Sequence, residues 1–127
     1  MGKKLLIVHA EPEYRIVISA LLRRKGYETI VTGNFGEAID ILSQKNESEA
    51  VFDLVIADPV YPGLPGCEFI KKLIKKSGST PVCVVASTCD QSYIFELLQS
   101  GCRGYLNKPF VPNRLIDFVC EMLELPP

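Results

Sequence analysis

Five short, mainly apolar segments occur along this chain of 127 residues, and each is separated from the next by enough residues for a helix. Aliphatic and β-branched runs of this length are typical of strands that are buried on both faces of a parallel sheet. The second and fifth segments are more polar or shorter than the others, which predicts that they lie nearer the edges of that sheet. The segments are 5–8 (LLIV), 28–31 (ETIV), 54–57 (LVIA), 82–86 (VCVVA) and 104–106 (GYL).

Amphipathic patterns predict helices in the first two intervals between these segments. The first pattern ends with a basic run at 23–25 and then Gly26, which is typical of the end of a helix. One face of that helix is formed by Ile16, Val17, Ala20 and Leu21. In the second interval, Asn34 is followed three residues later by Glu37, as in a capping box. The apolar residues that follow this motif are Ala38, Ile39 and Leu42.

Three further helices are expected after the third, fourth and fifth segments. Asp90 is a residue type that caps helix N-termini, and Pro112 suits the first turn of the last helix. Strand and helix therefore alternate five times, and right-handed crossovers place helices on both faces of one parallel sheet. The sequence predicts a single three-layer α/β domain over 1–127. The apolar stripes of these helices are Phe69, Ile70, Leu73 and Ile74; Ile94, Leu97 and Leu98; and Leu115, Phe118, Val119 and Met122.

Composition excludes several classes of protein. The net charge of −1 argues against broad electrostatic binding to nucleic acid, which needs a concentrated basic surface. No apolar run approaches the ~18 residues that span a bilayer. The five cysteines are odd in number and include no CxxC pair, so they resemble neither a disulfide framework nor a zinc site. We therefore expect a cytoplasmic protein with no membrane contact and no direct contact with nucleic acid.

Polar residues follow four of the five predicted strands. His9 and Glu11, with Ala10 between them, follow the first, Asp58 the third, Ser87 the fourth and Lys108 the fifth. In an open α/β sheet, ligands bind beyond the carboxyl ends of the strands, where the strand order reverses. An Asp, a Lys, a hydroxyl and a His or Glu are thus expected at one rim. Such a group suits the transfer of an anionic group to the Asp, with the Lys neutralising its charge.

At these residues the chain resembles response regulator receiver domains. The run 53–66 (DLVIADPVYPGLPG) is similar to the phosphoacceptor loop of that family. The run 105–110 (YLNKPF) is similar to its fifth-strand Lys-Pro signature, and 5–12 (LLIVHAEP) matches its first strand and loop in frame. The resemblance covers essentially the whole chain. It implies a flavodoxin-like (βα)5 fold, a doubly wound parallel sheet with strand order 2-1-3-4-5.

The resemblance also implies roles for individual residues. Asp58 would accept a phosphoryl group from a histidine kinase, a phosphotransfer protein or a small phosphodonor, with a divalent cation, usually Mg²⁺, bound beside it. Lys108 would pair with the phosphoryl oxygens, and the Lys108–Pro109 bond is often cis in the family. A hydroxyl after the fourth strand, here Ser87, would bond the phosphorylated form. Tyr105 would switch between outward and inward rotamers.

The chain departs from the family pattern at two places. The family carries an acidic pair directly after the first strand, and here those positions are His9 and Ala10. Only Asp58 and the displaced Glu11 remain as carboxylate ligands, which predicts a severe loss of affinity for Mg²⁺. The family's hydroxyl position falls on Ala86, so Ser87 lies one residue late.

Two functions remain open from the sequence. The first is a receiver domain in phosphorelay signalling, which is not a classical enzyme and catalyses at most its own phosphotransfer. Phosphorylation of Asp58 would change the surface of helix four, strand five and helix five toward an output domain or effector. The alternative is a pseudo-receiver that signals by phosphorylation-independent protein binding. On that interpretation Asp58 is a rim carboxylate held by Lys108, and His9 is a hydrogen-bonded structural residue.

Other interpretations are weaker. An aspartyl phosphatase would want a second acid at position 60, which is Val, and a flavodoxin would want a phosphate loop where the chain has 11–13 (EPE). The basic run on the third helix is typical of a solvated face. Residues 125–127 (LPP) are expected to be either the natural end of the chain or the start of a linker.

Overall fold

The computed structural model describes residues 2–44, 52–60, 66–87 and 91–124. The predicted N-cap at Asp90 and the predicted linker at 125–127 lie outside them. All five predicted strands and all five predicted helices are present, and the strand ends differ from prediction by at most one residue. The elements are β1 (Lys4–Val8), α1 (Pro12–Arg24), β2 (Glu28–Thr32), α2 (Phe35–Ser43), β3 (Leu54–Ala57), α3 (Gly66–Ser77), β4 (Val82–Ala86), α4 (Gln91–Gln99), β5 (Tyr105–Asn107) and α5 (Pro112–Glu124).

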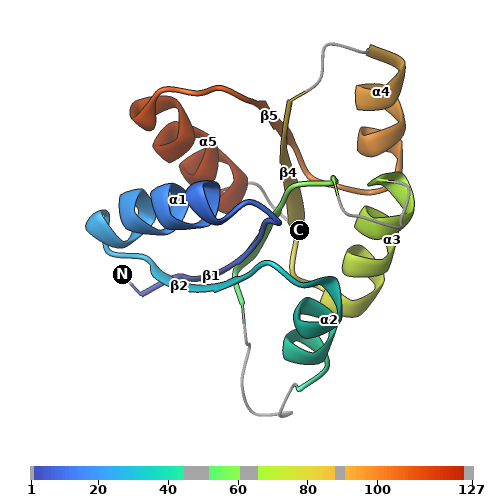
Figure 1. Ribbon diagram of the computed structural model, residues 1–127, viewed down its shortest axis with the longest axis horizontal. Coiled ribbons are helices and arrows are strands. Elements are labelled where there is room, and N and C mark those ends of the chain that lie inside the picture. The colour runs from blue at the N-terminus through green and yellow to red at the C-terminus, as the bar shows by residue number, and fades with distance from the viewer. Residues whose placement is uncertain (1, 45–51, 61–65, 88–90, 125–127) are drawn as a thin grey trace.

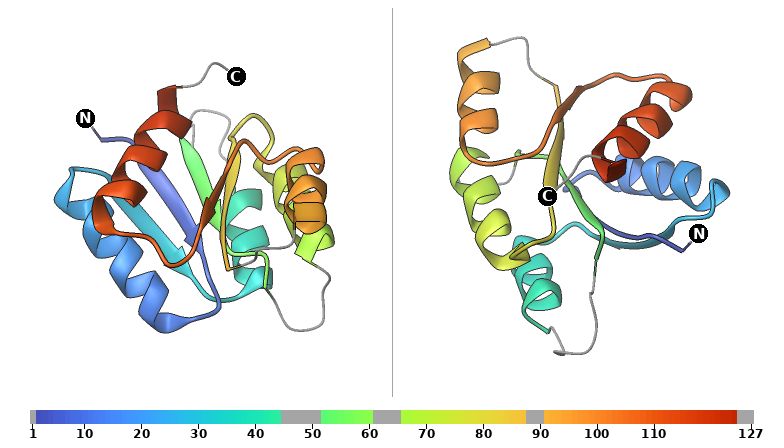
Figure 2. Two further views of the ribbon diagram at one scale, coloured as in Figure 1. Left: turned by 90° about the horizontal axis from the view of Figure 1, so that it is seen from above. Right: turned by 180° about the vertical axis from the view of Figure 1, so that it is seen from behind.

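The strands form one parallel sheet in the order β2-β1-β3-β4-β5, which confirms the predicted topology. The more polar β2 and the short β5 lie at its edges, as their composition predicted. Helices α1 and α5 cover one face of the sheet, and α2, α3 and α4 cover the other (Figure 1). The view from above and the view from behind show the same three layers (Figure 2).

Successive residues of each central strand enter different hydrophobic cores, because side chains alternate across a sheet. In β1, Leu5 and Ile7 pack with the side chains of α1 and α5, whereas Leu6 and Val8 pack with those of α2 and α3. Strands β3 and β4 follow the same alternation and are buried along their whole length. This double burial explains why their sequences are continuously apolar rather than alternating.

The local signals at helix ends are confirmed where the structure describes them. The Asn34 side chain accepts a hydrogen bond of 2.9 Å from the Glu37 N–H, which caps α2. Gly26 follows α1 with a φ of +93°, a conformation that L side chains rarely adopt. Pro112 begins α5, and the four predicted residues of its stripe are all buried.

The predicted apolar face of α1 is wrong except at Leu21, which packs against the core between the sheet and α1 and α5. Ile16 and Val17 are 67% and 48% exposed, and the residues that pack on the sheet are Ile18 and Leu22. Aliphatic residues occupy nearly every position from 16 to 22, so helical spacing fits more than one face equally well. The way in which α1 packs beside β1 determines which side of the helix is buried, and the local sequence pattern does not show this.

No helix among the described residues is long and apolar enough to cross a membrane.

Candidate functional site

Three of the predicted rim residues meet where the parallel strands end. His9 directly follows β1, Asp58 directly follows β3 and Lys108 directly follows β5. Strands β1 and β3 are neighbours, with Val8 opposite Ala57, so His9 and Asp58 leave the sheet side by side. This is the point where the strand order reverses, as predicted. The three side chains are nearly inaccessible, since the residues are 3%, 5% and 5% exposed.

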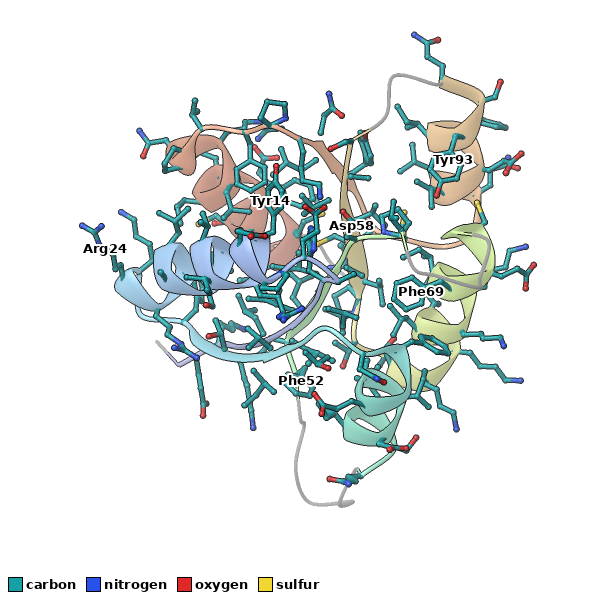
Figure 3. All side chains as sticks on the ribbon, in the orientation of Figure 1. Tyr14, Arg24, Phe52, Asp58, Phe69 and Tyr93 are labelled. Atoms are coloured by element: carbon teal, nitrogen blue, oxygen red, sulfur yellow. The ribbon has the colours of Figure 1, made fainter. Side chains whose placement is uncertain are left out.

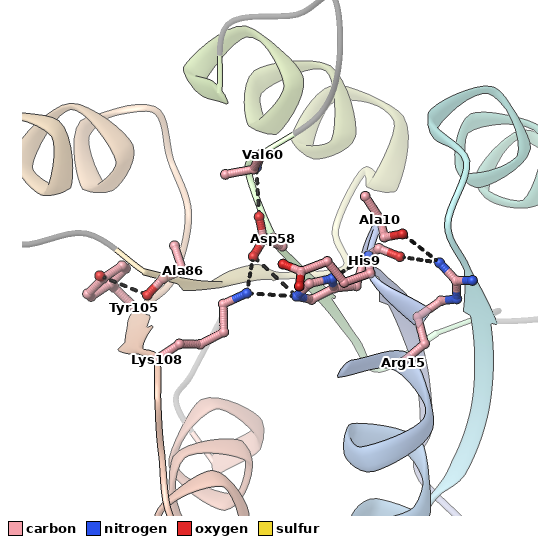
Figure 4. A network of polar contacts seen from close by, with 9 residues as sticks. His9, Ala10, Arg15, Asp58, Val60, Ala86, Tyr105 and Lys108 are labelled. Carbon is pink, nitrogen blue, oxygen red and sulfur yellow. Dashed lines mark hydrogen bonds and ion pairs between the residues drawn. The ribbon is translucent and has the colours of Figure 1, made fainter. Parts of the chain in front are cut away.

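Both carboxylate oxygens of Asp58 accept hydrogen bonds from the protein (Figure 4). Oδ2 lies 2.5 Å from Lys108 Nζ and 3.2 Å from His9 Nε2, and Oδ1 accepts a bond of 2.7 Å from the Val60 N–H. Burial raises the pKa of Asp58, but the hydrogen bonds from His9, Lys108 and Val60 and the charge of Lys108 outweigh it, so the pKa is lowered overall. Asp58 is therefore held as a carboxylate.

The imidazole of His9 is enclosed by four groups. Its Nδ1 accepts a hydrogen bond of 3.1 Å from the Glu11 N–H, and its Nε2 lies 2.8 Å from Lys108 Nζ as well as 3.2 Å from Asp58. The Tyr14 ring stacks on the imidazole, with centroids 4.9 Å apart and an interplanar angle of 15°. We call His9, Tyr14, Asp58 and Lys108 the rim cluster.

Tyr14 was missed by sequence reasoning although it contacts two members of the rim cluster. Lys108 Nζ lies 4.0 Å from the centroid of its ring, within the range of a cation–π interaction. In the view of Figure 3, Asp58 lies between Tyr14 on α1 and Tyr93 on α4. A signal was available, because position 14 precedes the buried Ile18 by four residues and so shares its helix face.

Arg15 was also missed, and it holds the loop that carries His9. Its Nη1 donates to the carbonyl of His9 at 2.7 Å and to the carbonyl of Ala10 at 3.2 Å (Figure 4). The guanidinium passes against Gly33, where a Cβ atom would lie 2.0 Å from Nη1. The backbone geometry of the His9–Ala10 loop therefore depends on a side chain from α1 and on the absence of one at position 33.

The other predicted site residues lie outside the rim cluster. Ser87 is exposed after β4, and Glu11 is exposed and contributes its backbone N–H. The Tyr105 hydroxyl lies 3.2 Å from the carbonyl oxygen of Ala86 and 2.8 Å from Oδ1 of Asn107. The Lys108–Pro109 peptide bond is cis, as the resemblance implied.

The donor set around Asp58 does not fit a divalent cation. Among the described residues, no group of three or more His, Cys, Asp and Glu side chains is placed to hold a metal ion. Mg²⁺ needs oxygen ligands in near-octahedral geometry, and here Oδ2 faces two nitrogen atoms while Ala10 offers only a methyl group. The charges of Asp58 and Lys108 also cancel, so this pair has no net negative charge that would attract a cation.

A comparison with known families decides the classification. The family model of the response regulator receiver domain matches residues 5–120. The chain belongs to this family. Receiver domains are signalling domains of two-component systems and not classical enzymes. The five-stranded order and the helices on both faces agree with that assignment.

Curated relatives include receivers of different lengths. The chain is 26% identical over 117 residues to the chemotaxis protein CheY of Thermotoga maritima, which covers 92% of this chain and 94% of that protein. It is 27% identical over 125 residues to sporulation initiation phosphotransferase F of Bacillus subtilis, covering 98% and 97%. Against the DNA-binding response regulator MtrA of Mycolicibacterium smegmatis, it is 28% identical and spans 52% of that protein.

Solved structures of receiver domains share the fold. The chemotaxis response regulator CheY4 of Vibrio cholerae matches with a TM-score of 0.81 and 25% identity, covering 96% of this chain and 99% of that one. The receiver domain of the sensor histidine kinase PA1611 of Pseudomonas aeruginosa matches with a TM-score of 0.81 and 22% identity, covering 98% and 100%. That structure has a magnesium ion coordinated in its active site cleft.

Proposed function

We propose that this domain is a pseudo-receiver, which keeps the receiver fold and signals through protein–protein binding without phosphorylation of Asp58. The observation that carries the proposal is the rim cluster, in which both oxygens of Asp58 are bonded to groups of the protein itself. Position 10, where the family has an acid, is alanine, and position 9 is a histidine that contacts Asp58.

Charge at the rim supports this proposal. Phosphoryl transfer to Asp58 would place about two negative charges where a single carboxylate charge is now neutralised by Lys108. In phosphoryl transfer generally, a bound metal ion neutralises the developing charge. Here the donor set does not fit such an ion, and Lys108 would be the only cation of the rim cluster. The added charge would then stay uncompensated in a site that is about 95% shielded from solvent.

The position of Tyr105 also supports a preset signalling surface. Its hydroxyl lies within hydrogen-bond distance of the Asn107 side chain and of the carbonyl of Ala86, the residue at which the family would have a phosphate-sensing hydroxyl. On our proposal this contact does not depend on phosphate. The partner is an effector protein or output domain that binds the α4-β5-α5 face, where Phe95 and Val111 are 61% and 66% exposed.

The second candidate is a phosphoacceptor that works in a phosphorelay with a histidine kinase or phosphotransfer protein. It is favoured by the position of Lys108 beside Asp58, from which its ammonium would pair with the phosphoryl oxygens as the family resemblance implied. Under either candidate we place the domain in a reducing cytoplasm, in keeping with the free thiols of the described Cys67, Cys83, Cys102 and Cys120.

Intact mass spectrometry after incubation with acetyl phosphate and Mg²⁺ separates the two candidates. We expect no phosphoryl adduct on the wild-type chain under conditions that label a phosphorylatable receiver fully. Asp58→Asn is the matched control, since it removes the acceptor and keeps the shape of the side chain. An adduct on the wild type that is absent from Asp58→Asn would overturn the pseudo-receiver and establish the phosphoacceptor.

A further inference from the structure

His9 is the sole histidine of the chain. It is buried and contacts both charged residues of the rim cluster, Asp58 and Lys108. His9 Nε2 lies 3.2 Å from Asp58 Oδ2 and 2.8 Å from Lys108 Nζ, and its Nδ1 lies 3.1 Å from the Glu11 amide nitrogen. Each ring nitrogen of histidine either donates or accepts, so these contacts constrain which nitrogen carries the proton.

The Glu11 amide decides the tautomer. A backbone N–H can only donate, so Nδ1 of His9 accepts and carries no proton. In the neutral ring the proton is then on Nε2, where it points to Asp58 Oδ2. The opposite tautomer would let Nε2 accept from Lys108, but it would set two donors against each other at Nδ1 and two acceptors against each other at Asp58. The Nε2–H form satisfies both the backbone and the carboxylate. In that form the Lys108 ammonium, which can only donate, donates to Asp58 Oδ2 beside Nε2–H and is not a hydrogen-bond partner of His9.

The same geometry places two N–H donors where a metal ion on Asp58 Oδ2 would bind. A Mg²⁺ ion bound there would lie about 2.0–2.1 Å from the oxygen and would need further oxygen ligands around it. The nitrogen atoms of His9 and Lys108 lie 3.2 Å and 2.5 Å from that oxygen, and both present N–H groups to it. These groups surround Oδ2 with hydrogen-bond donors. Such donors bind a carboxylate oxygen but cannot coordinate a cation.

Tyr14, on α1, packs against both His9 and Lys108. Its ring stacks on His9 and at the same time lies 4.0 Å from Lys108 Nζ, so one aromatic face contacts both nitrogen groups that bind Asp58. The Phe110 ring lies 6.2 Å from Tyr14 and supports it from the loop after β5. Three elements, α1, β1 and β5, are thereby joined at the rim by contacts that need no ion.

We propose that His9 is a positioning residue that replaces a divalent cation: its Nε2–H donates to Asp58 Oδ2 beside the Lys108 ammonium, and Tyr14 contacts both of these groups. The inference rests on the proposed absence of metal-dependent phosphorylation and explains what maintains the site instead. It assigns His9 a fixed tautomer. It also attributes the lack of a metal site to the N–H donors at Asp58 Oδ2, and not to the loss of carboxylates alone. We call this oxygen, occupied by donors, the blocked position.

The tautomer is measurable without assignment ambiguity because the chain has one histidine. Long-range ¹H–¹⁵N correlation spectra should show a protonated Nε2 and an unprotonated Nδ1, unchanged by millimolar Mg²⁺. Tyr14→Phe should keep the upfield shift that stacking gives the imidazole protons, and Tyr14→Ala should lose it. An Nδ1–H tautomer, a doubly protonated ring or a tautomer that changes with Mg²⁺ would overturn the inference.

Removing His9 after one acid has been restored tests the blocked position. Ala10 is exposed, so Ala10→Asp fits without repacking. With His9 retained, Ala10→Asp should show no Mg²⁺-dependent rise in Tm, whereas His9→Ala with Ala10→Asp, which has the same number of carboxylates, should bind Mg²⁺ at least tenfold more tightly. Adding Asp58→Asn to that double variant should abolish the binding. Equal Mg²⁺ affinity in Ala10→Asp and the double variant, or no binding by a folded double variant, would refute the role of His9.

Failure of this inference is distinguishable from failure of the proposed function. The tautomer and the Mg²⁺ titrations use no phosphodonor, so they report only on the metal position. A phosphoryl adduct on wild-type Asp58 would overturn the pseudo-receiver even if His9 has the expected tautomer. Should the double variant fail to fold, the tautomer measurement on the wild type still decides.

Discussion

Removing the ammonium group of Lys108 should strongly destabilise the fold. The Lys108 and Asp58 side chains are 2% and 4% exposed and lie 2.5 Å apart. Deleting one partner of a buried pair leaves the other charge uncompensated, which costs about 3–5 kcal/mol. Because Asp58 keeps its hydrogen bonds from His9 and Val60, we place Lys108→Met at the lower end, about 3 kcal/mol. Each kcal/mol lowers the Tm of a domain of this size by about 3–5 °C, so we expect a fall of about 10–15 °C.

A double-mutant cycle isolates the interaction between the two groups. Asp58→Asn removes the negative charge while nearly preserving shape, and in the Lys108→Met background it leaves no buried charge unpaired. We therefore expect the double variant to be more stable than the sum of the single losses predicts, with a coupling energy of about 2–3 kcal/mol. Lys3 and Asp53 are the matched control, because they lie 3.9 Å apart with side chains 52% and 38% exposed. Their coupling should be about 0.5 kcal/mol or less.

Urea unfolding at pH 7, followed by far-UV circular dichroism, gives the free energy of unfolding for all the variants. Equal m-values across the cycle would show that the denatured states are comparable. If the coupling between Asp58 and Lys108 is no larger than that between Lys3 and Asp53, the two groups do not form a buried unit. The account of the rim cluster as a metal-free electrostatic unit would then be wrong.

Three further variants test other parts of the structure. The pKa of Asp58 is lowered in the fold, so the stabilisation by its carboxylate is fully present above the ordinary pKa of about 3.9 and is lost as the pH falls through the folded value. The difference in free energy of unfolding between wild type and Asp58→Asn should therefore decrease on acidification, as measured by urea unfolding. Asn34→Ala removes the cap on the Glu37 N–H and should cost about 1 kcal/mol by the same assay, and an unchanged midpoint would contradict the cap. Gly33→Ala should displace the Arg15 guanidinium from its two carbonyl acceptors and shift the histidine resonances, whereas unchanged resonances would show that Arg15 does not hold this loop.

The fold could be predicted because the signals for it are local and agree with one another. Each central strand is buried on both faces, and this requires a continuously apolar sequence that few other elements have. The polarity of segment 28–31 and the shortness of the fifth segment correctly predicted that these two strands lie at the sheet edges. The meeting of His9, Asp58 and Lys108 followed from one rule, that the carboxyl ends of parallel strands lie at the same edge.

The contacts around His9 could not be predicted because they depend on where α1 docks. Ile16, Val17 and Ile18 are equally apolar, and only the packed structure shows that Ile18 faces the sheet. That choice of face also brings Tyr14, one turn earlier, onto His9 and Lys108. Sequence reasoning therefore identified the charged members of the rim cluster and missed the aromatic residue that joins them.

The electrostatics of the rim give Asp58 a role that does not depend on phosphoryl transfer. A rim with acids at positions 9 and 10 in addition to Asp58 would hold three carboxylates against one lysine, an excess of two negative charges that a divalent cation balances. With histidine and alanine there, the excess is zero, and Asp58 becomes the counter-charge of a lysine that is 2% exposed. Loss of Asp58 would then leave Lys108 buried without a carboxylate, at a cost of about 3–5 kcal/mol. The presence of Asp and Lys in this sequence is thus explained by stability alone, so phosphorylation has to be judged by the mass of the treated protein and not by these residues.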